Sequence, residues 1–152
     1  MLIHINATEE FKNNKKGIAM LKKLIDKAYH MDLEPFDLKT FLLKNKVLIL
    51  SVAKQWFDLM VTGEKTTEFR KPTKFIKDRL FNKDGSSKHY DYILINNGYG
   101  YHLPYFISKY EGFGTGYNNQ YTFSDGSNLT VLSEDYNIFL GEIIYEANIK
   151  SK

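Results

Sequence analysis

Residues 47–70 have the sequence VLILSVAKQWFDLMVTGEKTTEFR, and the predicted fold rests mainly on the local patterns within them. Its first six residues form a continuous apolar run, which has the length of one buried β-strand. The next ten residues predict a helix with one apolar face. That face consists of Ala53, Trp56, Phe57 and Met60. Gly63 follows at the position where a glycine commonly ends a helix, and the β-branched and aromatic residues of 66–70 predict a second strand.

Short segments with strand character continue to the end of the chain. Strands are predicted over residues 89–96, 104–113 and 139–146, with a short basic helix or loop at 73–81 and a turn at Asp125-Gly126. This order lacks the regular βαβ alternation of a doubly wound sheet. It favours an α+β fold, a mixed or antiparallel β-barrel with an inserted helix.

The chain ahead of residue 46 has a helical pattern. Helices are predicted over residues 8–29 and 35–44, and the first has an apolar stripe beside a lysine-rich face. We therefore divide the chain into a helical N-terminal extension, residues 1–45, and a β-barrel domain, residues 46–152. The extension is expected to dock on the barrel through Leu21, Leu24 and Ile25.

The composition excludes several classes of function. The 152 residues contain no cysteine, which rules out disulfides, thiolate metal sites and a cysteine nucleophile. The four histidines lack metal-ligand spacing, so we expect neither a metal nor a cofactor. The apolar segments are far shorter than the roughly 20 residues that span a bilayer, and the first residues lack a signal-peptide pattern. We therefore expect a soluble, cytoplasmic protein with no membrane partner.

Charge is distributed unevenly along the chain. Residues 54–83 carry eight cations and four acids, whereas residues 84–152 carry four cations and eight acids. A basic middle of this kind is compatible with a surface that binds polyanions, although short segments commonly differ by a few charges. Both arginines of the chain, Arg70 and Arg79, lie in this middle. Arginine offers a planar fork of donors that lysine cannot imitate, which points to a specific use.

Three ionisable side chains come together in the stretch GEKTTEFR, residues 63–70. In an extended strand Glu68 and Arg70 point to the same face, about 7 Å apart by strand rise, and the flexible stem of Lys65 can reach them. Glu68 could orient Arg70, accept a hydrogen bond from a base or act as a general base. The ordinary alternative is a surface ion-pair cluster, which stabilises a protein little.

This stretch resembles the G-x-K-x-x-E-x-R signature of ASCH domains, which are β-barrel relatives of the PUA RNA-binding fold. The resemblance covers about residues 46–148. It includes the apolar strand, the tryptophan-bearing helix, the motif strand, a middle strand at 90–96 and a glycine-containing closing strand at 140–143. The resemblance implies a PUA-like, ASCH-type mixed β-barrel that follows the N-terminal extension.

The resemblance also implies an ASCH-type nucleic-acid or nucleotide-binding protein that prefers RNA. The ligand-binding residues are then Lys65, Glu68 and Arg70, which line one cleft. From the residues themselves, Tyr99 or Tyr101 in the glycine-rich loop after residue 96 is a candidate to stack on a base. An ordinary turn with surface tyrosines explains that loop equally well.

Two alternative functions stay open. Some small ASCH proteins are amidohydrolases of N4-acetylcytidine, with a catalytic motif lysine and a threonine nucleophile, and ribonuclease activity is attributed to others. In such an enzyme Lys65 and Glu68 would be the catalytic residues. Glu68 occupies the position of that threonine, and Thr66 and Thr67 are out of register, which counts against the same mechanism. The other alternative is a protein-interaction module of phage or mobile-element origin, with a protein partner.

These hypotheses lead to different expectations for variants. If Lys65, Glu68 and Arg70 face an open cleft, truncating them weakens binding and leaves folding intact. If they form a structural ion pair, stability and binding fall together. Trp56 is predicted to belong to the core rather than to a stacking platform, because it shares the apolar helix face.

Overall fold

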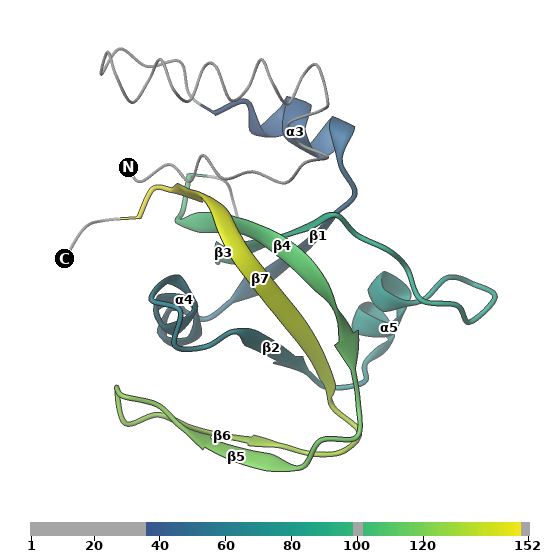
Figure 1. The fold of residues 1–152 in the computed structure, drawn as a ribbon, viewed down its shortest axis with the longest axis vertical. Coiled ribbons are helices and arrows are strands. Elements are labelled where there is room, and N and C mark those ends of the chain that lie inside the picture. Colours follow the sequence, from purple (N-terminus) through teal and green to yellow (C-terminus); the bar gives the residue numbers. More distant parts are fainter. Residues whose placement is uncertain (1–35, 99–101, 150–152) are drawn as a thin grey trace.

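The computed structural model of the chain describes residues 36–98 and 102–149. In order, the elements are α3 (Leu38–Lys44), β1 (Val47–Val52), α4 (Lys54–Val61), β2 (Thr67–Arg70), α5 (Lys74–Leu80), β3 (Tyr92–Asn97), β4 (Tyr105–Gly114), β5 (Asn119–Thr122), β6 (Asn128–Val131) and β7 (Tyr136–Ala147) (Figure 1). The first predicted helix lies outside the described residues, as do its docking residues, Leu21, Leu24 and Ile25. The division of the chain at residue 45 therefore stays a prediction.

Five of the strands form one mixed sheet in the order β1-β3-β4-β7-β2. β1 runs parallel to β3, and the other three pairings in this sheet are antiparallel. The sheet curls into a half-barrel whose two edge strands are β1 and β2 (Figure 1). The predicted α+β, barrel-like architecture with a helix inserted after its first strand is therefore confirmed.

Apolar side chains cover both faces of the half-barrel. β3 shows this most clearly: Ile93 and Ile95 belong to the cluster inside the curl, whereas Tyr92 and Leu94 belong to the cluster on the other face, as their alternation predicts. α4 and α5 fill the inside of the curl, and α3 covers the other face with the fully buried Phe41. The sheet is thus held between helices and supplies a rigid frame.

The helix α4 packs against the sheet through the face that the sequence predicts, but it begins after Ala53. Phe57 and Met60 are buried, and Trp56 packs half-buried against the same inner cluster. The prediction that Ala53 packs there is wrong, because Ala53 is the exposed N-cap residue; Leu59 is buried on this helix as well. A residue at the cap lies outside the helical turn, so helical spacing does not fix its direction.

Gly63 makes the change of direction from α4 into β2. Its φ is 84°, a left-handed value that side chains rarely adopt. The Gly63 N–H donates to the Met60 carbonyl at 3.0 Å, and the Lys65 N–H donates to the Leu59 carbonyl at 3.0 Å. These bonds satisfy the last turn of the helix, as expected for a glycine that follows a helix end. The second bond also fixes the position of the Lys65 backbone, from which its side chain starts.

The strands β5 and β6 form a separate antiparallel hairpin between β4 and β7. The turn at Asp125-Gly126 joins them, as predicted: the Gly126 N–H donates to the Phe123 carbonyl, and Asp125 accepts from the Ser127 N–H. The hairpin lies beside β2, on the side away from β4 (Figure 1). It therefore lies next to the strand that carries the GEKTTEFR stretch.

Candidate functional site

Glu68 and Arg70 point from β2 into the half-barrel. In the pairing of β2 with β7, Glu68 is opposite Ile138, and Ile138 belongs to the inner cluster. Alternation along the strand places Arg70 on the same side. Arg70 Nε donates to Glu68 Oε2 at 2.8 Å, so the predicted same-face geometry is present as a direct charge-assisted hydrogen bond.

Lys65 reaches the same carboxylate from the turn that follows α4. Its Nζ lies 3.3 Å from Glu68 Oε1 and donates to the Thr67 carbonyl. The ammonium also lies over two rings, 5.0 Å from the centroid of Phe69 and 5.9 Å from that of Trp56. A cation over ring faces is stabilised by the ring quadrupoles. Lys65, Glu68 and Arg70 thus form one connected chain of charges.

Arg70 also connects the two edges of the half-barrel. Its Nη2 donates to the carbonyl of Ser51 at 2.7 Å, and Ser51 lies on the opposite edge strand, β1. We call the place where this guanidinium bridges β1 and β2 the seam. Because strand pairing does not join these two edges in the described sheet, the side chain of Arg70 ties them together.

The charge cluster is largely withdrawn from water. Lys65 is 3% exposed and Glu68 is 6% exposed, whereas the side chain of Arg70 is 25% exposed. Burial lowers the pKa of the Lys65 ammonium below its usual value, although the adjacent Glu68 carboxylate opposes that shift. Taking charges out of water is costly unless each one is paired, and the carboxylate between two cations provides the pairing.

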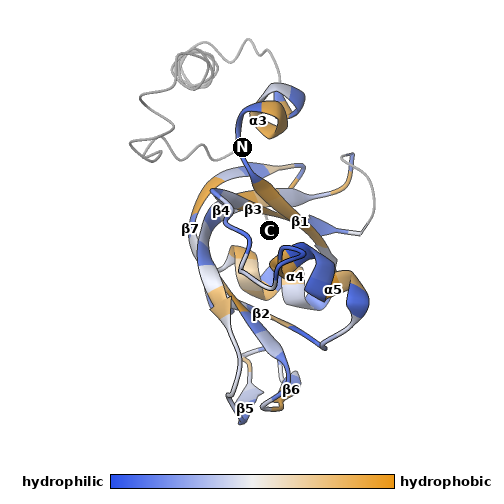
Figure 2. Cartoon of the chain, turned by 90° about the vertical axis from the view of Figure 1, so that its right-hand side faces the viewer, coloured by the Kyte–Doolittle hydropathy of each residue, from blue (hydrophilic) through white to orange (hydrophobic). Residues whose placement is uncertain are grey.

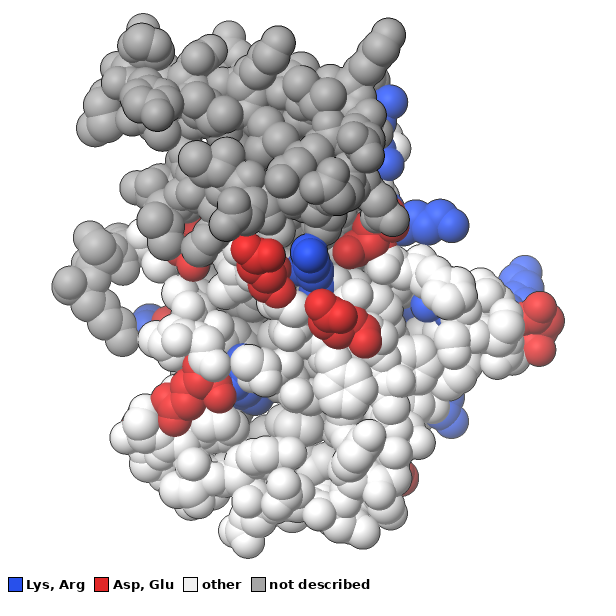
Figure 3. All heavy atoms as spheres, viewed as in Figure 1, with Lys and Arg blue, Asp and Glu red and all other residues white. Residues whose placement is uncertain are grey.

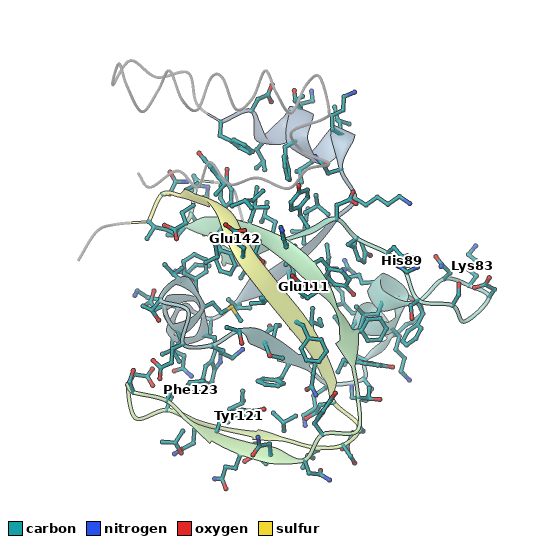
Figure 4. All side chains as sticks on the ribbon, in the orientation of Figure 1. Lys83, His89, Glu111, Tyr121, Phe123 and Glu142 are labelled. Carbon is teal, nitrogen blue, oxygen red and sulfur yellow. The ribbon has the colours of Figure 1, made fainter. Side chains whose placement is uncertain are left out.

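Aromatic side chains of the hairpin cover this cluster from outside β2. Tyr121 stacks on Phe69 at a centroid distance of 5.3 Å, and Phe123 meets Trp56 edge-on at 5.9 Å. Figure 4 shows Tyr121 and Phe123 on the hairpin below β2. Phe69 and Trp56, the two rings over the Lys65 ammonium, are therefore each backed by a second ring.

A pair of hydrogen bonds fastens the tip of the hairpin to the turn before β2. The carboxylate of Glu64 accepts from both the N–H and the hydroxyl of Ser124, each at 2.6 Å. Ser124 directly precedes the Asp125-Gly126 turn. Glu64 itself is exposed. We call its contact with Ser124 the Glu64–Ser124 latch.

A pocket of about 300 Å³ opens at the seam. Its walls are the end of β1, the start of α4, the inner side of β2 and, from the hairpin, Leu129. Trp56 and Phe69 supply aromatic wall, and Lys65, Glu68 and Arg70 supply charge. An open, partly apolar hollow with a few convergent polar groups is a candidate site for a small ligand.

Other candidates lie elsewhere. Tyr99 and Tyr101 lie outside the described residues. Glu111 and Glu142, two carboxylates that lie away from the seam, are exposed on β4 and β7 (Figure 4), and Figure 3 shows acidic side chains gathered on that face around a basic one. Thr66 is exposed.

Metal and membrane features can be judged for the described residues alone. Among residues 36–98 and 102–149, no group of three or more His, Asp or Glu side chains is arranged to hold a metal ion. None of the described helices has the length and apolar character needed to cross a bilayer.

Sequence reasoning missed the aromatic part of the site. Trp56 was predicted to be core, and it does pack on the inner cluster, but it also lines the pocket beside Lys65. Only the turn at Asp125-Gly126 was predicted, and neither the β5–β6 pairing nor its position over the charged residues was. The available signal was the alternation of Tyr121 and Phe123 just before a strong turn, which indicates an apolar hairpin face.

Comparisons of the chain with protein families, with curated proteins and with solved structures give no match. The case for a function therefore rests on the geometry of the seam.

Proposed function

We propose that this chain is a PUA-like, ASCH-type protein that binds RNA or a nucleotide in the seam pocket. One observation carries the proposal: an ammonium, a carboxylate and a guanidinium converge beneath two aromatic rings beside a pocket of about 300 Å³. Nucleotides combine a planar ring that stacks on aromatic side chains with oxygens that accept from cations. The resemblance of GEKTTEFR to the ASCH signature supports the same ligand class.

The three charged residues have different parts in this proposal. Glu68 already accepts from Arg70 Nε, Lys65 Nζ and the Phe69 N–H, so its part is to orient the two cations. Arg70 is the most exposed of the three, and its guanidinium has five donors, of which two are occupied within the cluster. It is the group that meets a phosphate or carbonyl oxygen of the ligand.

Binding to RNA is tested with the full chain and a labelled single-stranded RNA. We expect the affinity to fall linearly with salt on a double-logarithmic plot, with a slope of about −0.7 for each phosphate contacted. A DNA strand of the same sequence should bind more weakly. Fluorescence polarisation at several salt concentrations measures both quantities. Absence of binding at low salt would contradict the proposal and favour the protein-interaction alternative.

Ligand entry is expected to depend on the latch, because the hairpin covers two of the three charged residues. Replacing Glu64 by Ala removes both bonds to Ser124 and should let the hairpin open more often. Trp56 is the single tryptophan of the chain and contacts Phe123, so acrylamide quenching of its fluorescence reports the opening. We expect stronger quenching with a loss of stability of about 1–3 kcal/mol, because two hydrogen bonds to a carboxylate are lost.

Asp84→Ala is the matched control for the latch. Asp84 likewise accepts from the N–H and hydroxyl of one serine, Ser86, but in the loop after α5. Its replacement should leave Trp56 quenching unchanged. Equal quenching in the Glu64→Ala variant and the native chain would show that the latch does not hold the hairpin closed.

A hydrolase of the same fold is the second candidate, and the state of Lys65 favours it. Burial lowers the pKa of the Lys65 ammonium, and a lowered pKa is the direction that favours a lysine as general base. No threonine hydroxyl stands where Glu68 does, so the attacking group would be water. The test is turnover of N4-acetylcytidine or of labelled RNA by the native chain and by Lys65→Met. Cleavage that persists in Lys65→Met would exclude Lys65 as the base.

A further inference from the structure

The helix α5 carries an aromatic ring that packing does not use. Phe75 is 51% exposed, whereas its neighbour Ile76 and the later Leu80 are buried in the inner cluster. The guanidinium of Arg79 lies over one face of the Phe75 ring, with Cζ 3.5 Å from the centroid, and its Nη1 donates to the Phe75 carbonyl at 3.1 Å. A flat ring and a flat guanidinium are therefore stacked and held in place at the surface.

The surroundings of this pair are strongly basic. Residues 71–88 contain six cations, namely Lys71, Lys74, Lys77, Arg79, Lys83 and Lys88, and two acids, Asp78 and Asp84. Lys71 and Lys74 form salt bridges with carboxylates, and among the described residues the other four cations form none. The Asp78 carboxylate, whose pKa is lowered mainly by its hydrogen bond to Lys74, also interacts with the charges of Lys88 and Arg79. Figure 2 shows mainly hydrophilic colouring on the side of α5 that faces the viewer.

This surface begins next to the seam. Arg70 is the last residue of β2 and Lys74 is the first of α5, so their Cα atoms are at most about 15 Å apart by the reach of the chain. A ligand longer than one nucleotide that occupies the seam pocket can therefore extend onto α5.

We propose that Phe75 and Arg79, with Lys88 bound to the end of α5 and Lys83 in the loop that follows, form a second contact surface for single-stranded RNA. The inference rests on the proposed function of the seam and adds the substrate class, an unpaired strand rather than a free nucleotide. Phe75 offers its open side to a base, Arg79 adds a cation to the stack, and the lysines meet the phosphates. A duplex hides the faces of its bases, so it cannot use the ring.

The test compares two substitutions of Phe75 in the full chain. Phe75→Leu keeps an apolar side chain on the helix but removes the aromatic face, and Phe75→Tyr retains that face. The probe is a labelled 12-nucleotide single-stranded RNA, compared with its duplex and with a polyglutamate peptide of equal charge. We expect Phe75→Leu to weaken single-strand binding about 5- to 150-fold, because a base–aromatic stack contributes about 1–3 kcal/mol. Phe75→Tyr should bind nearly as the native chain does.

The lysines are tested by the salt dependence of the same binding. Replacing Lys83 and Lys88 together by Gln should reduce the slope by about 1.4, which is two single-strand phosphate contacts. The control variants lie on α3: Leu43→Ala removes another exposed apolar side chain, and Lys39 with Lys44→Gln removes two exposed lysines. Neither control should change the affinity or the slope.

Each outcome supports or contradicts the proposed contact surface on α5. If Phe75→Leu binds the single strand as tightly as the native chain, the second surface is wrong. If polyglutamate binds as tightly as the RNA does, and Phe75→Leu changes neither affinity, the basic surface binds an acidic protein partner instead. If Phe75→Leu has no effect while Arg70→Lys weakens a mononucleotide, the seam proposal stands alone. If Phe75→Leu weakens the 12-nucleotide strand while no mononucleotide binds, the seam proposal fails and the α5 surface binds RNA by itself.

Discussion

Replacing Glu68 by Ala is expected to lower the free energy of unfolding by about 3–5 kcal/mol, because it leaves buried cations without their counter-ion. Glu68 is the only carboxylate in salt-bridge contact with Lys65 or Arg70 among the described residues. Lys65 would keep the Thr67 carbonyl as a hydrogen-bond partner, but a carbonyl does not neutralise its charge. Urea denaturation followed by Trp56 fluorescence measures the loss.

Two variants show whether the loss comes from buried charge. Asp58→Ala breaks an ion pair with Lys54 on the surface of α4, and such exposed pairs contribute about 1 kcal/mol or less. Glu68→Gln keeps the shape and one acceptor oxygen, so it should cost less than Glu68→Ala. If Glu68→Ala costs no more than Asp58→Ala, the cluster does not stabilise the seam.

The burial of the cluster changes what truncation can report about function. The sequence-based expectation was that variants of Lys65, Glu68 and Arg70 fold normally if the three face an open cleft. Lys65 and Glu68 are buried under the hairpin, so their truncation is expected to affect stability whether or not they meet a ligand. Arg70, which is partly exposed at the seam, is the one of the three whose replacement can separate binding from folding.

Elements that depend on local chemistry could be predicted from the sequence. Because the side-chain period of a strand is two residues, the strand predicted at 89–96 implies that Ile93 and Ile95 share one face and that Leu94 lies on the other, as the structure shows. Gly63 was placed at a helix end because few other residues tolerate its φ. Both predictions needed only neighbours within a few residues.

The arrangement of the site could not be predicted in the same way. Ser51 and Arg70 meet because the sheet curls, and Trp56 meets Phe123 because the hairpin folds back beside β2. Those contacts join residues 19 positions apart and much farther, and no local pattern encodes the curl. The spacing within GEKTTEFR gave the direction of Glu68 and Arg70 but carried no sign that Lys65 is covered.

Replacing Arg70 by Lys is expected to weaken binding of RNA or of a mononucleotide by about 1–3 kcal/mol, or roughly 5- to 150-fold. The positive charge is kept, so the affinity for a phosphate that requires only a nearby charge would hardly change. A lysine cannot donate at once to Glu68 and to the Ser51 carbonyl while it presents further planar donors to the pocket. The variant therefore loses both the bridge across the seam and the orientation of the remaining donors.

The measurement pairs the dissociation constant with the melting temperature, and Arg79→Lys is the matched control. Arg79 is the other arginine of the chain, and it lies on α5, outside the residues that line the seam pocket where a mononucleotide is expected to bind. Arg79→Lys should therefore leave mononucleotide affinity unchanged while Arg70→Lys weakens it. Arg70→Lys is expected to lower the melting temperature only modestly, because the sheet, α4 and α5 still pack through the inner cluster. Native affinity in Arg70→Lys would mean that the guanidinium serves only to close the seam. If the affinity falls only in parallel with the stability, the cluster serves the fold. Replacing a residue that only binds the ligand would lower the affinity without lowering the stability.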